Sequence, residues 1–81
     1  MNIEERVITA IAHTFDLEIN QVKLESTLIK DLGADSLNLV ETILAIEEEF
    51  DLDIPDDDAI KLGGDCTVQD VVNYVGAHHS E

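Results

Sequence analysis

Apolar residues recur at intervals of three and four positions in three separate parts of the chain. One set lies in residues 3–15, a second in residues 36–50 and a third in residues 68–75. This spacing places apolar side chains along one face of an α-helix. No stretch of useful length alternates between apolar and polar residues, as a strand with one buried face would. The sequence therefore predicts an all-α fold.

Each of the three predicted helices is preceded by residues that can cap its first turn. Asn2 stands three positions before Glu5, and Thr67 stands three positions before Asp70, which is the spacing of a capping box. Asp35 precedes the second helix, where its side chain can accept hydrogen bonds from the unpaired backbone N–H groups. The helices are therefore expected to begin immediately after these residues.

Proline and glycine indicate where the later helices end. Pro55 prevents the second helix from continuing, because the residue before a proline avoids helical backbone angles. Residues 56–58 are all aspartate, which suits the positive end of a short third helix, and the glycines at positions 63–64 are expected to end it. Gly76 is expected to end the last helix. The hydroxyl of Tyr74, at the edge of that helix's apolar face, is expected to remain hydrated.

The segment between the first two long helices, residues 16–34, shows no sustained period. We expect a long loop lying against the core, with a short helical turn near residues 20–22. A loop of this length is uncommon in a compact domain and usually indicates a function. The 81 residues allow one domain, residues 1–81, with an aliphatic core, because the chain has only three aromatic residues. The predicted architecture is a four-helix bundle of three longer helices and one short third helix.

The formal net charge of −15 limits the partners that this chain can have. Nucleic-acid backbones and anionic membranes would repel it, whereas basic protein surfaces would attract it. The N-terminal residues lack the basic segment and long apolar run of a signal peptide or a membrane span. We therefore expect a soluble, cytoplasmic and monomeric protein that binds no nucleic acid and does not insert into membranes.

The acidic residues are unevenly distributed along the chain. Between Lys30 and Lys61 there are eleven acidic residues and no basic one. This one-sided run flanks a helix whose other face is apolar. Because a field of a single sign steers oppositely charged partners, we interpret the run as a docking surface for basic proteins.

Two motifs invite a metal-site interpretation, and both fail on inspection. In a calcium loop beginning at Asp51, Pro55 would occupy the fifth position and Leu62 the twelfth, where a glutamate is required. The three histidines, at positions 13, 78 and 79, have no nearby Asp or Cys companions. Cys66 is the one cysteine and is expected to be a small, partly buried apolar residue. No designed metal site is predicted.

Ser36 is the residue with the most chemical interest. As a catalytic nucleophile it would need a base and an oxyanion hole, and its surroundings do not match the G-x-S-x-G elbow. It could instead be a helix-start serine that satisfies backbone N–H groups. It could also display its hydroxyl for modification by another enzyme. The start of a helix favours an anionic group such as a phosphodiester.

The run DLGADSLNLVETILAIEEEFDLDIPDDDA, residues 31–59, resembles the acyl carrier proteins of type II fatty-acid synthesis. The segments IEERV at 3–7 and TVQDVVNYV at 67–75 are also similar to that family. The resemblance implies a non-enzymatic four-helix bundle in which Ser36 carries covalent 4′-phosphopantetheine. A holo-carrier synthase, which is a phosphopantetheinyl transferase, would attach this group from coenzyme A. The terminal thiol would hold acyl chains as thioesters and deliver them to the enzymes of fatty-acid synthesis.

The resemblance also implies two further sets of functional residues. The first would meet basic docking patches on the partner enzymes, and it comprises Asp35, Leu37, Glu41, Leu44, Glu47 and Glu48. The second would border the cavity that shelters the acyl chain, and it comprises Val40, Ile43, Ile46, Ile54, Ala59, Leu62 and Val72.

Departures from the family pattern leave the pathway open. Asn38 and Leu39 stand where fatty-acid carriers commonly have an acidic and then a small polar residue, and the connection over residues 62–67 is longer than usual. A specialised carrier for a polyketide, nonribosomal peptide or aminoacyl pathway is therefore an alternative. A plain acidic interaction module without a prosthetic group is a third.

Overall fold

The computed structural model describes residues 2–62 and 66–78. Within these ranges the backbone forms four α-helices and one short 3₁₀ helix, which confirms the predicted all-α architecture. The elements, in chain order, are α1 (Ile3–Thr14), η1 (Ile19–Gln21), α2 (Ser36–Phe50), α3 (Asp56–Leu62) and α4 (Val68–His78).

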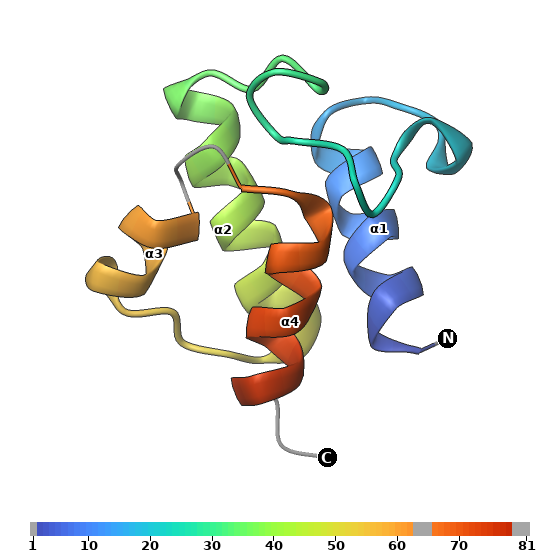
Figure 1. Ribbon diagram of the computed structural model, residues 1–81. Helices are drawn as coiled ribbons and strands as arrows, with labels where there is room; N and C mark the ends of the chain where they lie inside the picture. Colours follow the sequence, from blue (N-terminus) through green and yellow to red (C-terminus); the bar gives the residue numbers. More distant parts are fainter. Residues whose placement is uncertain (1, 63–65, 79–81) are drawn as a thin grey trace.

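The three longer helices pack around one core, with α1 in contact with both α2 and α4. The short α3 lies beside α2 and α4, on the side away from α1 (Figure 1). The long loop between α1 and α2 crosses one end of the bundle. None of the described helices has the length and apolar character needed to cross a membrane.

The predicted caps are present at the starts of the three longer helices. The Asn2 side chain accepts a hydrogen bond from the Glu5 N–H at 2.8 Å. Asp35 accepts one from a backbone N–H in the first turn of α2 and so closes a capping box. Thr67 and Asp70 each accept a hydrogen bond from the other's backbone N–H, at 3.1 and 3.0 Å. Local side-chain chemistry therefore sets all three starts.

The predictions for helix ends were less accurate. The helix α2 ends at Phe50, as expected, and Asp51 follows it in a left-handed backbone conformation with φ of 52°. The prediction that Gly76 ends the last helix was wrong, because α4 continues to His78. At this end of α4 the ring of His78 stacks on Tyr74, and its Nδ1 lies 2.8 Å from the Tyr74 carbonyl oxygen. The predicted end of α3 at the glycines at positions 63–64 lies outside the described residues.

The long loop contributes to the core, as its scattered apolar residues suggested. Val22 and Leu28 are buried together with residues from α1, α2 and α4. An isolated antiparallel bridge between Thr27 and Thr67 attaches the loop to the residues before α4. Beside it, the Leu28 N–H donates to the carbonyl oxygen of Cys66 at 3.0 Å. The sequence did not predict this bridge, because a single residue pair leaves no alternating pattern.

Cys66 is buried, as predicted. Its thiol donates a hydrogen bond to the carbonyl oxygen of Leu62, at 2.9 Å between sulfur and oxygen. The side chain therefore connects the end of α3 to the segment that precedes α4.

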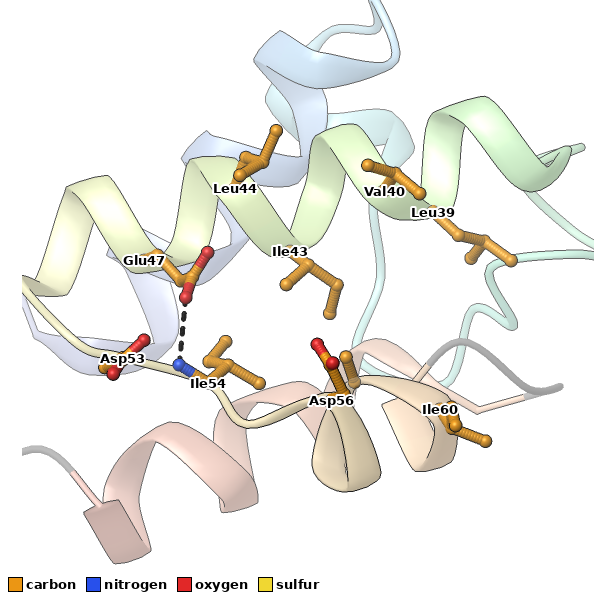
Figure 2. A pocket seen from close by; sticks show the side chains of 10 residues that line it. Leu39, Val40, Ile43, Leu44, Glu47, Asp53, Ile54, Asp56 and Ile60 are labelled. Carbon is orange, nitrogen blue, oxygen red and sulfur yellow. Dashed lines mark hydrogen bonds between the residues drawn. The ribbon is translucent and has the colours of Figure 1, made fainter.

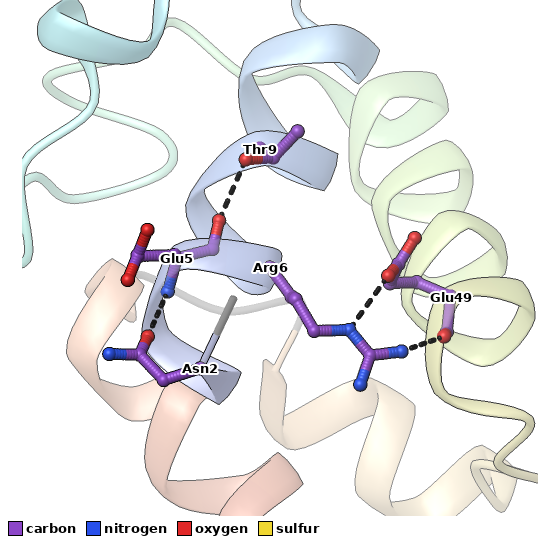
Figure 3. Close-up of polar contacts among 5 residues, drawn as sticks. All are labelled: Asn2, Glu5, Arg6, Thr9 and Glu49. Carbon is purple, nitrogen blue, oxygen red and sulfur yellow. Dashed lines mark hydrogen bonds and ion pairs between the residues drawn. The ribbon is translucent and has the colours of Figure 1, made fainter.

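Arg6 links α1 to the C-terminal end of α2 through three contacts, and Figure 3 shows the two with Glu49. Its Nε lies 2.8 Å from the Glu49 carboxylate, and its Nη2 donates to the Glu49 backbone carbonyl at 2.7 Å. Its guanidinium carbon also lies 4.4 Å from the centre of the Phe50 ring. A planar guanidinium can make all three contacts together, whereas an ammonium cannot.

Substitution of Arg6 tests this contact. We expect Arg6→Ala to lower the free energy of unfolding by about 1 kcal/mol, since an exposed ion pair adds little and the carbonyl and ring contacts add the rest. Arg6→Lys should recover less than half of that loss. Urea denaturation followed by circular dichroism measures both values. If the lysine variant were as stable as the wild type, the planar shape of the guanidinium would contribute nothing to the free energy of unfolding.

Candidate functional site

Ser36 is the first residue of α2, and its side chain is exposed. The preceding turn is fixed by Gly33, which has φ of +74°, and by buried Ala34, whose N–H donates to the Leu28 carbonyl. Asp35 accepts the hydrogen bond at the start of the helix, so Ser36 does not act as the cap. Over residues 2–62 and 66–78, no protein group bonds to the Ser36 hydroxyl. The structure therefore leaves this hydroxyl accessible and without the bonded base that a catalytic serine needs.

An open groove of about 700 Å³ lies between α2 and α3, and we call it the α2–α3 groove. Leu39 and Ile43 of α2 point towards α3 from one side, and the 51–55 segment and α3 close the other (Figure 2). Leu39 and Ile60 lie towards one end, and Glu47 and Asp53 lie towards the other. Its lining residues are Leu39, Val40, Ile43, Leu44, Glu47, Asp53, Ile54, Asp56, Ala59 and Ile60.

The groove includes four of the residues that the resemblance assigns to an acyl cavity: Val40, Ile43, Ile54 and Ala59. Three others do not line it. Ile46 and Leu62 are buried in the core, and Val72 packs against the core.

Leu39 and Ile60 line the groove although they were not among the predicted cavity residues. Leu39, Ile43 and Glu47 follow one another at intervals of four along α2, and this row faces α3. Sequence spacing could have identified Leu39 from this row, because residues four apart share a helix face. It could not have identified Ile60, whose position depends on how α3 packs.

The predicted partner-binding residues of α2 are exposed, with one exception. Leu37 and Leu44 are 67% and 52% exposed, which is unusual for leucine in a small bundle. Their acidic neighbours Asp35, Glu41 and Glu48 are also exposed. Glu47 is instead partly buried, and one of its carboxylate oxygens accepts a hydrogen bond from the Ile54 N–H at 2.9 Å.

The hydrogen bond between Glu47 and Ile54, drawn in Figure 2, has a structural role. It attaches the segment before α3 to α2 and so fixes one end of the groove. The role in partner binding that was predicted for Glu47 stays a prediction.

The hydroxyl of Tyr74, which was predicted to remain hydrated, also has a partner within the protein. Its hydroxyl donates to the Asp58 carboxylate of α3 at 2.7 Å. Burial, followed by this hydrogen bond and by the charges of Asp58 and Glu47, raises the pKa of Tyr74 to about 12. The sequence did not predict this partner, because helical periodicity does not indicate a contact between α3 and α4.

Two of the three histidines lie within the part of the chain that the structure describes. His13 and His78 are exposed, and His79 lies outside the described residues. Among residues 2–62 and 66–78, no three His, Cys, Asp or Glu side chains are placed to hold a metal ion together.

Comparison with known proteins agrees with this geometry. Residues 5–75 match the family model described as "Phosphopantetheine attachment site". The acyl carrier protein of Clostridium acetobutylicum is 48% identical over 77 residues, which cover 95% of this chain and 96% of that protein. The chain belongs to the acyl carrier protein family. As a family member, this carrier has 4′-phosphopantetheine as its prosthetic group.

The titration of Tyr74 tests the contact between α3 and α4 in the carrier. Because this is the only tyrosine of the chain and there is no tryptophan, its ionisation can be followed by ultraviolet absorbance. We expect a midpoint of about 12 in the folded protein, against an ordinary value of 10.0. The raised pKa favours the folded state fully below about pH 10, and this contribution is lost as the pH rises towards 12.

Asp58→Asn should move that midpoint down towards 10, because it removes the charge of the acceptor. Circular dichroism recorded during the same titration shows whether the helices persist. A midpoint near 10 in the folded wild type would mean that the hydroxyl is not bonded to Asp58.

Proposed function

We propose that Ser36 is the attachment site of 4′-phosphopantetheine and that the protein carries acyl chains between the enzymes of fatty-acid synthesis. The observation that carries this proposal is an exposed, unbonded serine hydroxyl on the same helix as an open apolar groove. The name of the Clostridium relative supports the carrier role. The attached group supplies a thiol that holds the acyl chain as a thioester.

The residues around Ser36 suit a phosphodiester at this position. As the first residue of α2, Ser36 lies at the positive end of the helix, where backbone N–H groups favour an anion. Asp35 and the buried turn before it hold the backbone in place, so the hydroxyl projects from a fixed base. Its oxygen would form a bond to phosphorus of coenzyme A, the nucleotide part would leave, and the synthase would take the proton.

The exposed face of α2 suits the docking of basic enzymes. Glu41 and Glu48 lie on it with exposed Leu37 and Leu44, so an acidic field surrounds apolar contact points. Charges of this kind speed encounter with a basic patch, and the leucines can be buried in the complex. In this proposal the carrier is a cytoplasmic monomer of one domain, residues 1–81, and it catalyses no reaction itself.

A specialised pathway is the second candidate, and Leu39 is the observation that favours it. Leu39 lines the groove, so it can affect which chain is held there. The other departure, Asn38, has a structural explanation, because its side chain accepts from the Asp35 N–H in the capping box. Loading by a malonyl transferase would support the fatty-acid pathway. Loading only by an amino-acid-activating enzyme would support the alternative.

Modification with coenzyme A tests the attachment site. We expect the wild-type carrier to gain the mass of one phosphopantetheine group when it is incubated with coenzyme A and a broad-specificity transferase. Ser36→Ala should gain none, because it lacks the oxygen that accepts phosphorus. Intact mass spectrometry measures both. An unchanged wild type, or an equal gain on the alanine variant, would refute the assignment.

Charge reversal on α2 tests the docking surface. We expect Glu41→Lys and Glu48→Lys each to slow acyl transfer from a basic partner enzyme several-fold at low salt, with less effect at high salt. Helicity should change little, because both side chains are exposed. Glu25→Lys, an exposed change of the same charge in the loop, is the matched control. If all three variants slowed transfer equally, the net charge of the protein would explain the effect, and a specific docking surface on α2 would be refuted.

A further inference from the structure

The helix α3 forms one wall of the α2–α3 groove, and it is too short to be stable alone. It has seven residues, whereas isolated helices need more than about twelve to persist in water. Its position therefore depends on its tertiary contacts. Ala59 and Ile60, which line the groove, move with it.

Contacts at both ends of α3 come from neighbouring chain segments. Before the helix, the Ile54 N–H donates to the Glu47 carboxylate of α2. At its last residue, Leu62 is buried, and its carbonyl oxygen accepts from the Cys66 thiol. These contacts fix where α3 begins and ends, and they leave the middle of the wall to other interactions.

Within α3, Ala59 packs against the core, and Asp58 in the first turn contacts Tyr74 of α4. Its hydroxyl donates to Asp58, the residue immediately before Ala59 and Ile60. The helix α4 is a firm support, because Val71 and Val75 are 2% and 0% exposed in the core. A hydrogen bond to a carboxylate is stronger than one between neutral groups, so the bond can restrain a short helix.

We propose that Tyr74 is a positioning residue for the α2–α3 groove. Through Asp58 it holds α3 at the separation from α2 at which the groove encloses an apolar acyl chain. This inference rests on the proposed function, because it takes the thioester-bound chain as the occupant. Tyr74 touches no cargo in this proposal, and it acts only by restraining the wall.

Tyr74→Phe removes the hydroxyl and keeps the ring, so it tests the bond with little loss of packing. We expect amide hydrogen exchange at Ala59, Ile60 and Leu62 to accelerate about tenfold relative to exchange in α1, the size expected for losing a hydrogen bond to a charged group. Loading with an octanoyl group from octanoyl coenzyme A should raise the melting temperature of the wild type. In the variant that rise should be smaller by about half, because the wall encloses the chain less firmly.

Three further variants separate positioning from general stability. Val7→Ala lowers core stability from α1, and it should leave the octanoyl-dependent rise in melting temperature unchanged. Asp58→Ala should reproduce Tyr74→Phe, and it tests the same bond if the phenylalanine variant folds poorly. Asp58→Asn keeps an oxygen acceptor without the charge, so its rise should fall between those of Asp58→Ala and the wild type. The double variant Tyr74→Phe with Asp58→Ala should add little to either single change.

Failure of this inference can be distinguished from failure of the proposed function. If wild-type protein takes up no octanoyl-phosphopantetheine, the proposed function is wrong and this inference is wrong with it. If wild type is loaded but Tyr74→Phe shows the same exchange in α3 and the same rise in melting temperature, only the inference is wrong. An equal loss of the rise in Val7→Ala would also overturn it, since general stability would then explain the effect.

Discussion

The burial of one face of α2 determines how the rest of the molecule is arranged. Thr42, Ile46 and Phe50 follow one another at intervals of four and lie in the core, which fixes the rotation of the helix about its axis. The row through Leu39 and Glu47 must then face α3 and form the groove. Other faces carry exposed leucines and acidic side chains to solvent. One packing requirement thus separates the buried side of this helix from its exposed side, where Leu44 also lines the groove.

The chain combines a strong negative charge with a thin core, and the two affect each other. A net charge of −15 on 81 residues opposes compaction, and a domain of this size buries a smaller share of its surface than a larger one. The core is mainly aliphatic, so its side chains can repack with little change in free energy. The α2–α3 groove is already open in this structure, so the core need not rearrange to expose it.

The sequence was sufficient where local chemistry determines the structure. The caps at Asn2, Asp35 and Thr67 satisfy backbone groups within their own helices, so their residue types predicted the helix starts. Helical spacing also predicted which faces are apolar. The family resemblance singled out Ser36. Only the structure shows that Ser36 is exposed and that Asp35, not Ser36, caps the helix.

Predictions were incomplete where distant segments meet. The partner of the Tyr74 hydroxyl, Asp58, comes from α3. Periodicity marks Ile46 as apolar, but it does not say whether that side chain faces the core or the groove. These features are set by the packing of one helix on another, which leaves no pattern within either segment.

The bridge between Thr27 and Thr67 has a consequence for the order of events during synthesis. The loop that leads to Ser36 is held by backbone bonds to residues 66–68, which leave the ribosome well after Ser36 itself. The loop before Gly33 and Ala34 therefore has its full set of backbone bonds only after the first residues of α4 have been made. A modifying enzyme that recognises this loop would therefore modify folded, complete chains in preference to nascent ones.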